Sequence, residues 1–194
     1  MAVNLQGKVA IPEDRFEMRL SGSGGQGMIL ASVIFAEAIG KSDQRNVVQT
    51  QSYGPEARGG ASKSDVVISE NEIYYPKAMK LDLLLTMTQE SLDKYYADLK
   101  DGGTLIVDTT LVTEFPTDDY FGLPFTQLAR EKAGHVMVAN VIALAAIAEL
   151  TGTISREALT AAVLNRAPKG TEEKNKKAIE IGFAEAAKLK AGKG

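Results

Sequence analysis

The feature that most constrains the fold is a glycine-rich loop between a strand pattern and an apolar helix pattern. The loop reads Gly22-Ser23-Gly24-Gly25-Gln26-Gly27, in which Gly22, Gly24 and Gly27 have the spacing Gly-x-Gly-x-x-Gly. Residues 16–20 before it alternate apolar and polar side chains, as a strand does, and residues 26–39 after it are apolar over most of a helical surface. A strand, a glycine turn and a helix in this order predict an α/β fold.

Strand and helix patterns alternate along the rest of the chain. The expected strands are 46–50, 64–68 with an extension at 71–75, 81–85 and 104–108, and the expected helices are 89–99, 125–133, 138–151 and 155–165. Residues 81–85 are almost continuously apolar, which is typical of a buried parallel strand. The pattern predicts a three-layer, doubly wound (Rossmann-like), mostly parallel sheet with helices on both faces and right-handed crossovers.

Glycine and alanine positions add local expectations. Gly40 is placed to end the first helix in the left-handed conformation, and Gly102-Gly103 to turn the chain into the strand at 104–108. Residues 113–124 are the least regular stretch, with room for a short strand at the sheet edge. The helix around 141–150 is rich in alanine, so we expect it to approach another element closely.

The 194 residues are enough for one α/β domain, and we find no repeat or internal boundary. We expect residues 1–14 to be an N-terminal arm, 15–168 the α/β core, and 169–194 a C-terminal amphipathic helix with a solvated charged face.

Composition excludes several kinds of chemistry. The chain has no cysteine and one histidine, so it has no disulfide, no thiolate ligands for an iron–sulfur cluster and no multi-histidine metal site. No Gly-x-Ser-x-Gly elbow accompanies His135, and we assign no catalytic residue and no metal ligand. A net charge of −3 argues against nucleic acid as a partner. We see no membrane span and no signal peptide, so we expect a cytoplasmic protein.

The glycine loop has the context of an anion site. Glycine lets a ligand approach the backbone, and unpaired amides at the start of the next helix favour phosphate or pyrophosphate. The alternative is a tight turn that holds no ligand. An NAD site would need an acidic residue at the end of the second strand, but residues 47–52 read Val-Val-Gln-Thr-Gln-Ser. An NADP site remains open, with Arg58 as the cation.

A second glycine-rich stretch, residues 53–60, reads Tyr-Gly-Pro-Glu-Ala-Arg-Gly-Gly without a hairpin pattern. We expect it at the carboxyl edge of the sheet, close to the first loop, because loops after adjacent strands meet there. The planar guanidinium of Arg58 suits a phosphate or a carboxylate. The alternative is an Arg58–Glu56 ion pair that stiffens a surface loop. The residues assigned to this partner- or substrate-facing loop are Tyr53, Gly54, Glu56, Gly59 and Gly60.

Three further polar residues are interpreted mainly as structural. His135 follows Gly134 at the end of a predicted helix, which favours a capping or packing role. Asn140 near the start of the alanine-rich helix is interpreted as a cap. Asp108 ends a predicted strand, where it either faces the ligand cleft or caps a turn with Thr109 and Thr110.

With these residues in view, the chain resembles the gamma subunit of the 2-oxoacid:ferredoxin (or flavodoxin) oxidoreductases. The matching pieces are the loop at 22–27, the string Thr50-Gln-Ser-Tyr-Gly-Pro-Glu-Ala-Arg-Gly-Gly60, the strands at 62–68 and 82–85, and the helix near Asn140. The amino-acid sequence of the second loop looks most like that of the 2-oxoglutarate branch. Other 2-oxoacids stay open as substrates.

The resemblance implies a subunit that does not catalyse alone. Such enzymes decarboxylate a 2-oxoacid oxidatively, make an acyl-coenzyme A and pass electrons to ferredoxin or flavodoxin. It implies that thiamine diphosphate, magnesium and iron–sulfur clusters lie in partner subunits (alpha, beta and a ferredoxin-like delta). It also implies that this chain helps to bind coenzyme A, through Gly22, Ser23, Gly24, Gly25, Gln26, Gly27 and Arg58, with Arg58 alternatively docking a partner. A free-standing NADP-dependent oxidoreductase and a purely structural module are the competing hypotheses.

Overall fold

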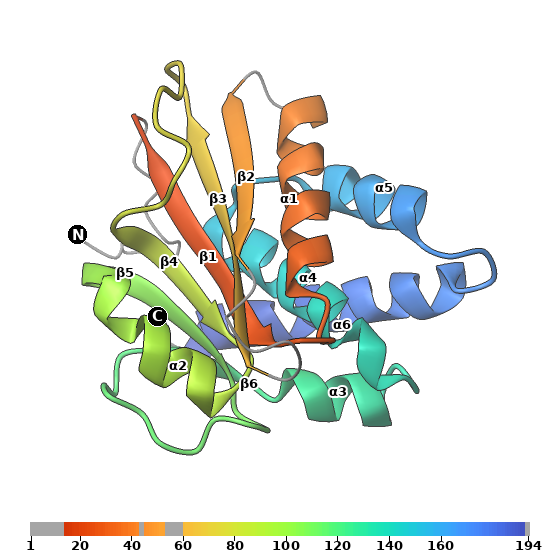
Figure 1. Cartoon of the computed structure of the whole chain (residues 1–194). Helices are drawn as coiled ribbons and strands as arrows, with labels where there is room; N and C mark the ends of the chain where they lie inside the picture. Colours follow the sequence, from red (N-terminus) through yellow and green to blue (C-terminus); the bar gives the residue numbers. More distant parts are fainter. Residues whose placement is uncertain (1–13, 43–44, 53–59, 193–194) are drawn as a thin grey trace.

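The computed structural model describes residues 14–42, 45–52 and 60–192, and it forms a sheet with helices on both faces (Figure 1). The strands are β1 (Phe16–Ser23), β2 (Asn46–Ser52), β3 (Ala61–Ser69), β4 (Leu81–Thr86), β5 (Leu99–Asp108) and β6 (Phe121–Leu123). The helices are α1 (Met28–Ser42), α2 (Gln89–Tyr95), α3 (Phe125–Glu131), α4 (Ala139–Thr151), α5 (Arg156–Arg166) and α6 (Glu172–Gly192), with 3-10 turns η1 (Tyr96–Asp98) and η2 (Val136–Val138). The predicted α/β class is confirmed.

The sheet has the strand order β2-β3-β1-β4-β5-β6. β1, β4, β5 and β6 pair in parallel, whereas β3 pairs antiparallel with both β1 and β2. Five of the six described strands therefore run in one direction, which confirms a mostly parallel sheet. The antiparallel pairing of β3 with β1 and β2 was not indicated by the sequence pattern, which predicted crossovers between parallel strands.

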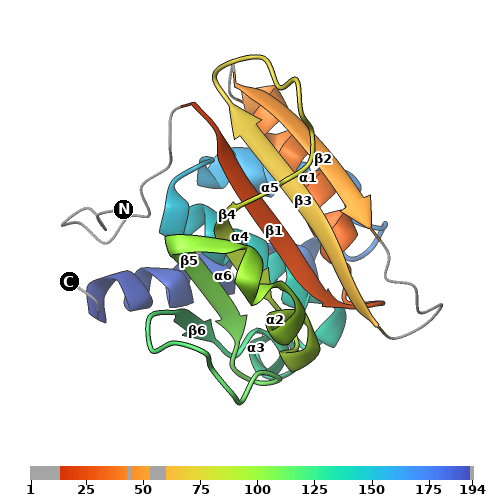
Figure 2. The same ribbon diagram turned by 60° about the vertical axis from the view of Figure 1, so that its left-hand side comes forward.

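The two faces of the sheet carry unequal layers (Figure 2). The larger hydrophobic core joins one face to α1, α3, α4, α5 and α6, and the smaller one joins the other face to α2 and the segment after β5. β1 is buried on both sides, since Phe16, Met18 and Leu20 belong to the larger core and Glu17, Arg19 and Ser21 are buried as well.

Ion pairs satisfy the buried polar side of β1. Arg19 is 1% exposed and donates to both carboxylate oxygens of Asp65, at 2.6 and 3.0 Å, and also to Asp98. Burial lowers the pKa of the Arg19 guanidinium, but the hydrogen bonds and negative charges of Asp65 and Asp98 outweigh it, so the pKa is raised. The strand that leads into the glycine loop is therefore fixed from both faces.

Several boundaries differ from the predictions because backbone pairing overrides local glycine signals. Gly40 lies inside α1, and its φ is not positive, so it does not end the helix. Gly102 and Gly103 lie within β5 beside a shift in the β4–β5 register, and not before the strand. Residues 71–75 form no strand, and the helix predicted at 89–99 ends at Tyr95 and continues as η1. The edge strand expected within 113–124 is β6.

α4 and α6 pack very closely, as the alanine-rich sequence predicts. Nearly all of α4 is buried, including Ile142 and Ala145. Gly182 of α6 lies against them, and a Cβ at this position would overlap the carbonyl oxygen of Ile142 and lie 2.6 Å from the Ala145 Cβ. α6 buries one side, including Ala178, Phe183 and Ala186.

Gly182→Ala is expected to destabilise the protein by about 2 kcal/mol, because the added methyl group forces two helix backbones apart in a packed core. Gly192→Ala on the same helix is the matched control, since a Cβ there meets nothing within 4 Å. It should change stability by less than about 0.5 kcal/mol. Urea unfolding followed by circular dichroism measures both, and equal stabilities would contradict the close α4–α6 contact.

Candidate functional site

The glycine loop connects the end of β1 at Ser23 to the start of α1 at Met28. Gly25 and Gly27 have φ values of 95° and 75°, in the left-handed region that favours glycine. Gly24 and Gly25 are exposed, and the first turn of α1 follows, with the amide of Ala31 donating to the Gly27 carbonyl at 2.9 Å. The backbone amides before Ala31 in that turn are the unpaired donors that a helix N-terminus presents.

The side chain of Gln26 occupies part of the glycine loop. The amide of Ser23 donates to Gln26 Oε1 at 2.8 Å, and the amide of Gln26 donates to the Ser23 carbonyl at 3.2 Å. A Cβ on Gly22 would overlap Gln26 Oε1, so glycine at this position leaves room for the glutamine. Ser23 and Gln26 therefore stabilise the turn, and exposed backbone for a ligand is left at Gly24, Gly25 and the first turn of α1.

Asn140 ties the start of α4 to this loop. Its Nδ2 donates to the Gly27 carbonyl at 3.3 Å, and its Oδ1 accepts from the amide of Val141 at 2.8 Å. The helix begins one residue earlier, at Ala139, and its N-cap residue Val138 makes no side-chain bond. Asn140 is therefore not the cap that the sequence predicted. Its role is a bond between two segments far apart in sequence, which a local pattern does not show.

The strand ends on either side of the second loop lie at the same edge as the glycine loop. Ser23 pairs with Ala61 in the β1–β3 register, and Ser62 Oγ donates to the Gly22 carbonyl at 3.2 Å. Gly60, half-buried, is the first described residue after the loop. The predicted residues Tyr53, Gly54, Glu56, Arg58 and Gly59 lie outside the described residues, so their roles stay predictions. The two flanking strands are antiparallel neighbours, which the sequence did not indicate.

His135 and Asp108 have structural roles in the described chain. His135 Nδ1 accepts from the amide of Met137 at 3.3 Å and caps η2, as predicted. Asp108 is fully buried, and it accepts from the amide of Thr110 at 3.0 Å and from the amide and hydroxyl of Thr126. The carboxylate therefore caps a turn and holds the start of α3.

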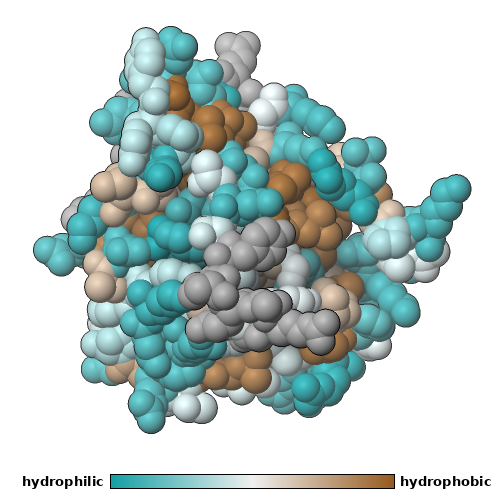
Figure 3. Space-filling view, viewed as in Figure 1, coloured by the Kyte–Doolittle hydropathy of each residue, from teal (hydrophilic) through white to brown (hydrophobic). Residues whose placement is uncertain are grey.

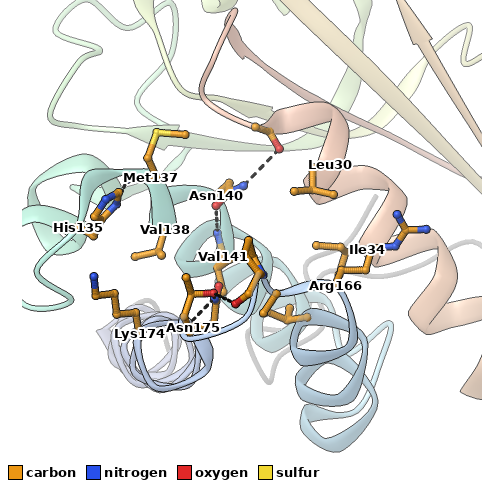
Figure 4. Close-up of a pocket in the computed structure, with 15 residues that line it drawn as sticks. Leu30, Ile34, His135, Met137, Val138, Asn140, Val141, Arg166, Lys174 and Asn175 are labelled. Atoms are coloured by element: carbon orange, nitrogen blue, oxygen red, sulfur yellow. Dashed lines mark hydrogen bonds between the residues drawn. The ribbon is translucent and has the colours of Figure 1, made fainter.

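A cavity of about 320 Å³ opens beside the glycine loop, and no sequence pattern indicated it (Figure 4). It lies between α1, the η2–α4 corner and the α5–α6 connection. Its walls are mostly apolar, and its polar lining groups are basic or uncharged. The lining residues are Gly27, Leu30, Ile34, His135, Met137, Val138, Asn140, Val141, Val163, Arg166, Ala167, Pro168, Thr171, Lys174 and Asn175.

On the face of the molecule drawn in Figure 3, the apolar side chains of the described residues do not form one continuous surface. In Figure 3 hydrophobic residues form separate patches between hydrophilic ones. Leu30 and Met137, which line the cavity, are 45% and 55% exposed.

Among the described residues no group of three or more histidine, aspartate or glutamate side chains could hold a metal ion. In the same part of the chain, no helix is long and apolar enough to cross a membrane.

Comparisons with known proteins agree with one another. The family model described as pyruvate ferredoxin/flavodoxin oxidoreductase matches residues 17–185. The 2-oxoglutarate synthase subunit KorC of Methanocaldococcus jannaschii is 48% identical over 179 residues, which cover 90% of this chain and 96% of the relative.

Two solved structures resemble the fold. The gamma subunit of the keto/oxoacid ferredoxin oxidoreductase from Geobacter sulfurreducens has a TM-score of 0.81 and 48% identity, covering 90% of this chain and 97% of the other. The 2-oxoglutarate:ferredoxin oxidoreductase from Magnetococcus marinus, solved with 2-oxoglutarate, coenzyme A and succinyl-CoA, has a TM-score of 0.77. At 22% identity, with 93% of this chain but 32% of that chain covered, this second match supports the fold alone.

Substitutions at the two left-handed glycines should separate strain from packing. Alanine at Gly25 or Gly27 costs roughly 1–2 kcal/mol from the backbone conformation alone. A Cβ at Gly27 would also lie 2.5 Å from Asn140 Nδ2, whereas one at Gly25 meets nothing within 4 Å. Gly27→Ala should therefore be more destabilising than Gly25→Ala by about 1 kcal/mol or more in urea unfolding. Equal losses would show that the Asn140 contact does not constrain the loop.

Proposed function

We propose, from the premise that the chain belongs to the pyruvate ferredoxin/flavodoxin oxidoreductase family, that it is the gamma subunit of a 2-oxoacid:acceptor oxidoreductase. The enzyme would decarboxylate a 2-oxoacid, transfer the acyl group to coenzyme A and pass the electrons to ferredoxin or flavodoxin. The chain would act within the assembled enzyme and be inactive alone.

The observation that carries this proposal is the 48% identity to KorC over nearly the full length of both chains. Relatives named for other 2-oxoacids are less similar. The ketoisovalerate subunit VorA of Methanothermobacter thermautotrophicus is 34% identical over 134 residues, and the pyruvate/ketoisovalerate common gamma subunit of Thermococcus kodakarensis is 30% identical. This difference favours 2-oxoglutarate as the substrate of the assembled enzyme.

The amino-acid composition supports the assignment of the redox cofactors to other subunits. Because the sequence has no cysteine, it supplies no thiolates for iron–sulfur clusters, and such clusters must be held elsewhere. We therefore place thiamine diphosphate, magnesium and the clusters in alpha, beta and ferredoxin-like delta partners. A cytoplasmic location remains a prediction.

Within the enzyme, the glycine loop is the part of this chain that we assign to coenzyme A. A pyrophosphate would meet the exposed backbone at Gly24 and Gly25 and the unpaired amides at the start of α1, where the helix dipole favours negative charge. Gly22, Ser23 and Gln26 would hold the turn in shape, and Gly27 would fix it to Asn140. Arg58 would meet the same anion or dock a partner subunit.

Gly24→Val should raise the KM for coenzyme A at least about tenfold in the assembled enzyme, because a branched side chain blocks approach to the backbone. Gly24 is exposed, and its φ is not positive, so valine adds little backbone strain. The KM for the 2-oxoacid serves as the internal control and should not change. An unchanged KM for coenzyme A would remove the loop from the site.

The subunit assignment is tested by isolating the tagged chain from its native cells and measuring dye reduction that depends on a 2-oxoacid and coenzyme A. Co-purification of partners that carry thiamine diphosphate and iron–sulfur clusters, with 2-oxoglutarate preferred, is the expected outcome. Preference for pyruvate or a branched-chain acid would refute the substrate assignment only. A chain that purifies without partners or activity would refute the subunit assignment itself.

A further inference from the structure

A second cavity, of about 410 Å³, lies between α2, η1 and the segment that follows β5. We call it the α2 cavity. It is on the other face of the sheet from α1 and α4, and it shares no residue with the cavity beside the glycine loop. Figure 1 shows α2 and the segment after β5 next to each other. Both follow strands that run parallel to β1, so the α2 cavity begins at the sheet edge that also carries the glycine loop.

One glutamine joins the two walls of the α2 cavity. Gln89 Oε1 accepts from two backbone amides of the segment after β5, both at 3.0 Å. Gln89 Nε2 donates to Asp93 Oδ1 at 2.9 Å and to the carbonyl of Glu114 at 3.0 Å. Phe115 is held in addition by stacking on Tyr120, with the ring centroids 4.4 Å apart. Because the walls are fixed in this way, a partner that binds here pays little for ordering them.

The rim of the α2 cavity is acidic. Asp93 and Glu114 are exposed, and neither carboxylate forms an ion pair within the described chain. The adjacent cation Lys94 lies over the ring of Tyr95 and does not line the cavity. Residues 113–120 carry three acidic side chains and no basic one. Two carboxylates without a cation of their own favour a positively charged group from outside the chain.

The floor of the α2 cavity is apolar and aromatic. Leu92 is 1% exposed, and Tyr96 and Phe115 are half-buried against the smaller core. Pro116 adds an exposed apolar wall. Arginine suits this combination, because its methylene stem packs on apolar surface while its planar guanidinium stacks on aromatic rings and pairs with carboxylates.

The position of the α2 cavity indicates where the arginine comes from. This step rests on the proposed function, in which the acyl group is transferred to coenzyme A on a cofactor of partner subunits. These subunits must then approach the sheet edge that carries the glycine loop. α2 is tied to that edge, since Glu90 accepts from the amide of Ala61 at 3.1 Å. We propose that the α2 cavity is a docking site for an arginine side chain of a partner subunit, held between Asp93 and Glu114 over the aromatic floor.

Removal of the two charges tests the docking site in the assembled enzyme. Asp93→Asn combined with Glu114→Gln keeps the shape of both side chains and the acceptor for Gln89. The dissociation constant between the tagged chain and its thiamine- and cluster-bearing partners, measured by mass photometry on dilution, should rise at least about tenfold. Asp101→Asn combined with Glu180→Gln removes the same charge at exposed residues outside the cavity and should leave the constant unchanged. Equal constants for the two double variants would overturn the proposal.

Two further measurements identify the occupant. N-acetylarginine amide should shift the backbone NMR signals of Leu92 and Glu114 in the full chain, whereas N-acetylcitrulline amide, an uncharged analogue of the same shape, should not. Equal shifts with both probes, or none with the arginine probe, would exclude arginine. Salt-dependent self-association of the isolated chain that is lost in the Asp93→Asn, Glu114→Gln variant would identify a second copy as the occupant and refute a partner subunit.

The behaviour of the unmodified chain separates this inference from the function it rests on. If that chain does not associate with subunits that carry thiamine diphosphate and iron–sulfur clusters, the proposed function fails. If it does, and the Asp93→Asn, Glu114→Gln variant associates equally well, only the docking site fails. The expected result is weaker association of this variant with an unchanged KM for coenzyme A at saturating partner concentration, because the α2 cavity contains no residue of the glycine loop.

Discussion

Burial of α4 on all sides constrains the rest of the helical layer. Twelve of its thirteen residues are buried, mostly alanine and branched aliphatic side chains. Because these side chains are short, α6 approaches until Gly182 touches the backbone of Ile142, and α1, α3 and α5 pack around the same helix. The position of α4 also fixes Asn140 against Gly27, and through that bond the shape of the glycine loop. A change in core volume that shifts α4 would therefore also shift Asn140 and the glycine loop bonded to it, without any change in the loop sequence.

Much of the fold follows from periodicity, and the deviations follow from contacts that a local pattern does not contain. The strand at 16–20, the apolar helix after it and the buried strand at 81–85 were predictable because each has a strong apolar period. The antiparallel return of β3 was not, since the flanking sequence lacks a short hairpin turn and pairing is decided by neighbours in the sheet. Gly40 has nearly the sequence context of a helix end, yet α1 continues to Ser42 while packed against β2.

The candidate site also has one part that could be predicted from the sequence and one part that could not. The glycine loop could be found from spacing alone, because its residues are adjacent in sequence. The cavity could not, because Leu30, Asn140, Arg166 and Asn175 come from four helices and converge only in the folded chain. The spacing also did not reveal that Ser23 and Gln26 bond to each other, which leaves fewer exposed donors in the loop than its sequence suggests. Lys174 lies among the lysines and glutamates of α6, and its sequence context does not distinguish it from Lys177 on the solvated face.

The antiparallel course of β3 has a consequence for how relatives of this chain can vary. Ser52 and Ala61 are held in the sheet by pairing with Lys63 and Ser23, so both ends of the intervening loop are anchored at one edge. Loop-closure entropy grows only slowly, by about 0.6 kcal/mol for each doubling of loop length. A one-residue insertion in β2 or β3 would instead turn every following side chain to the opposite face. A change in the number of residues between Ser52 and Ala61 would therefore disturb the fold far less than a change inside either strand, where it would break the register of the sheet that supports the glycine loop.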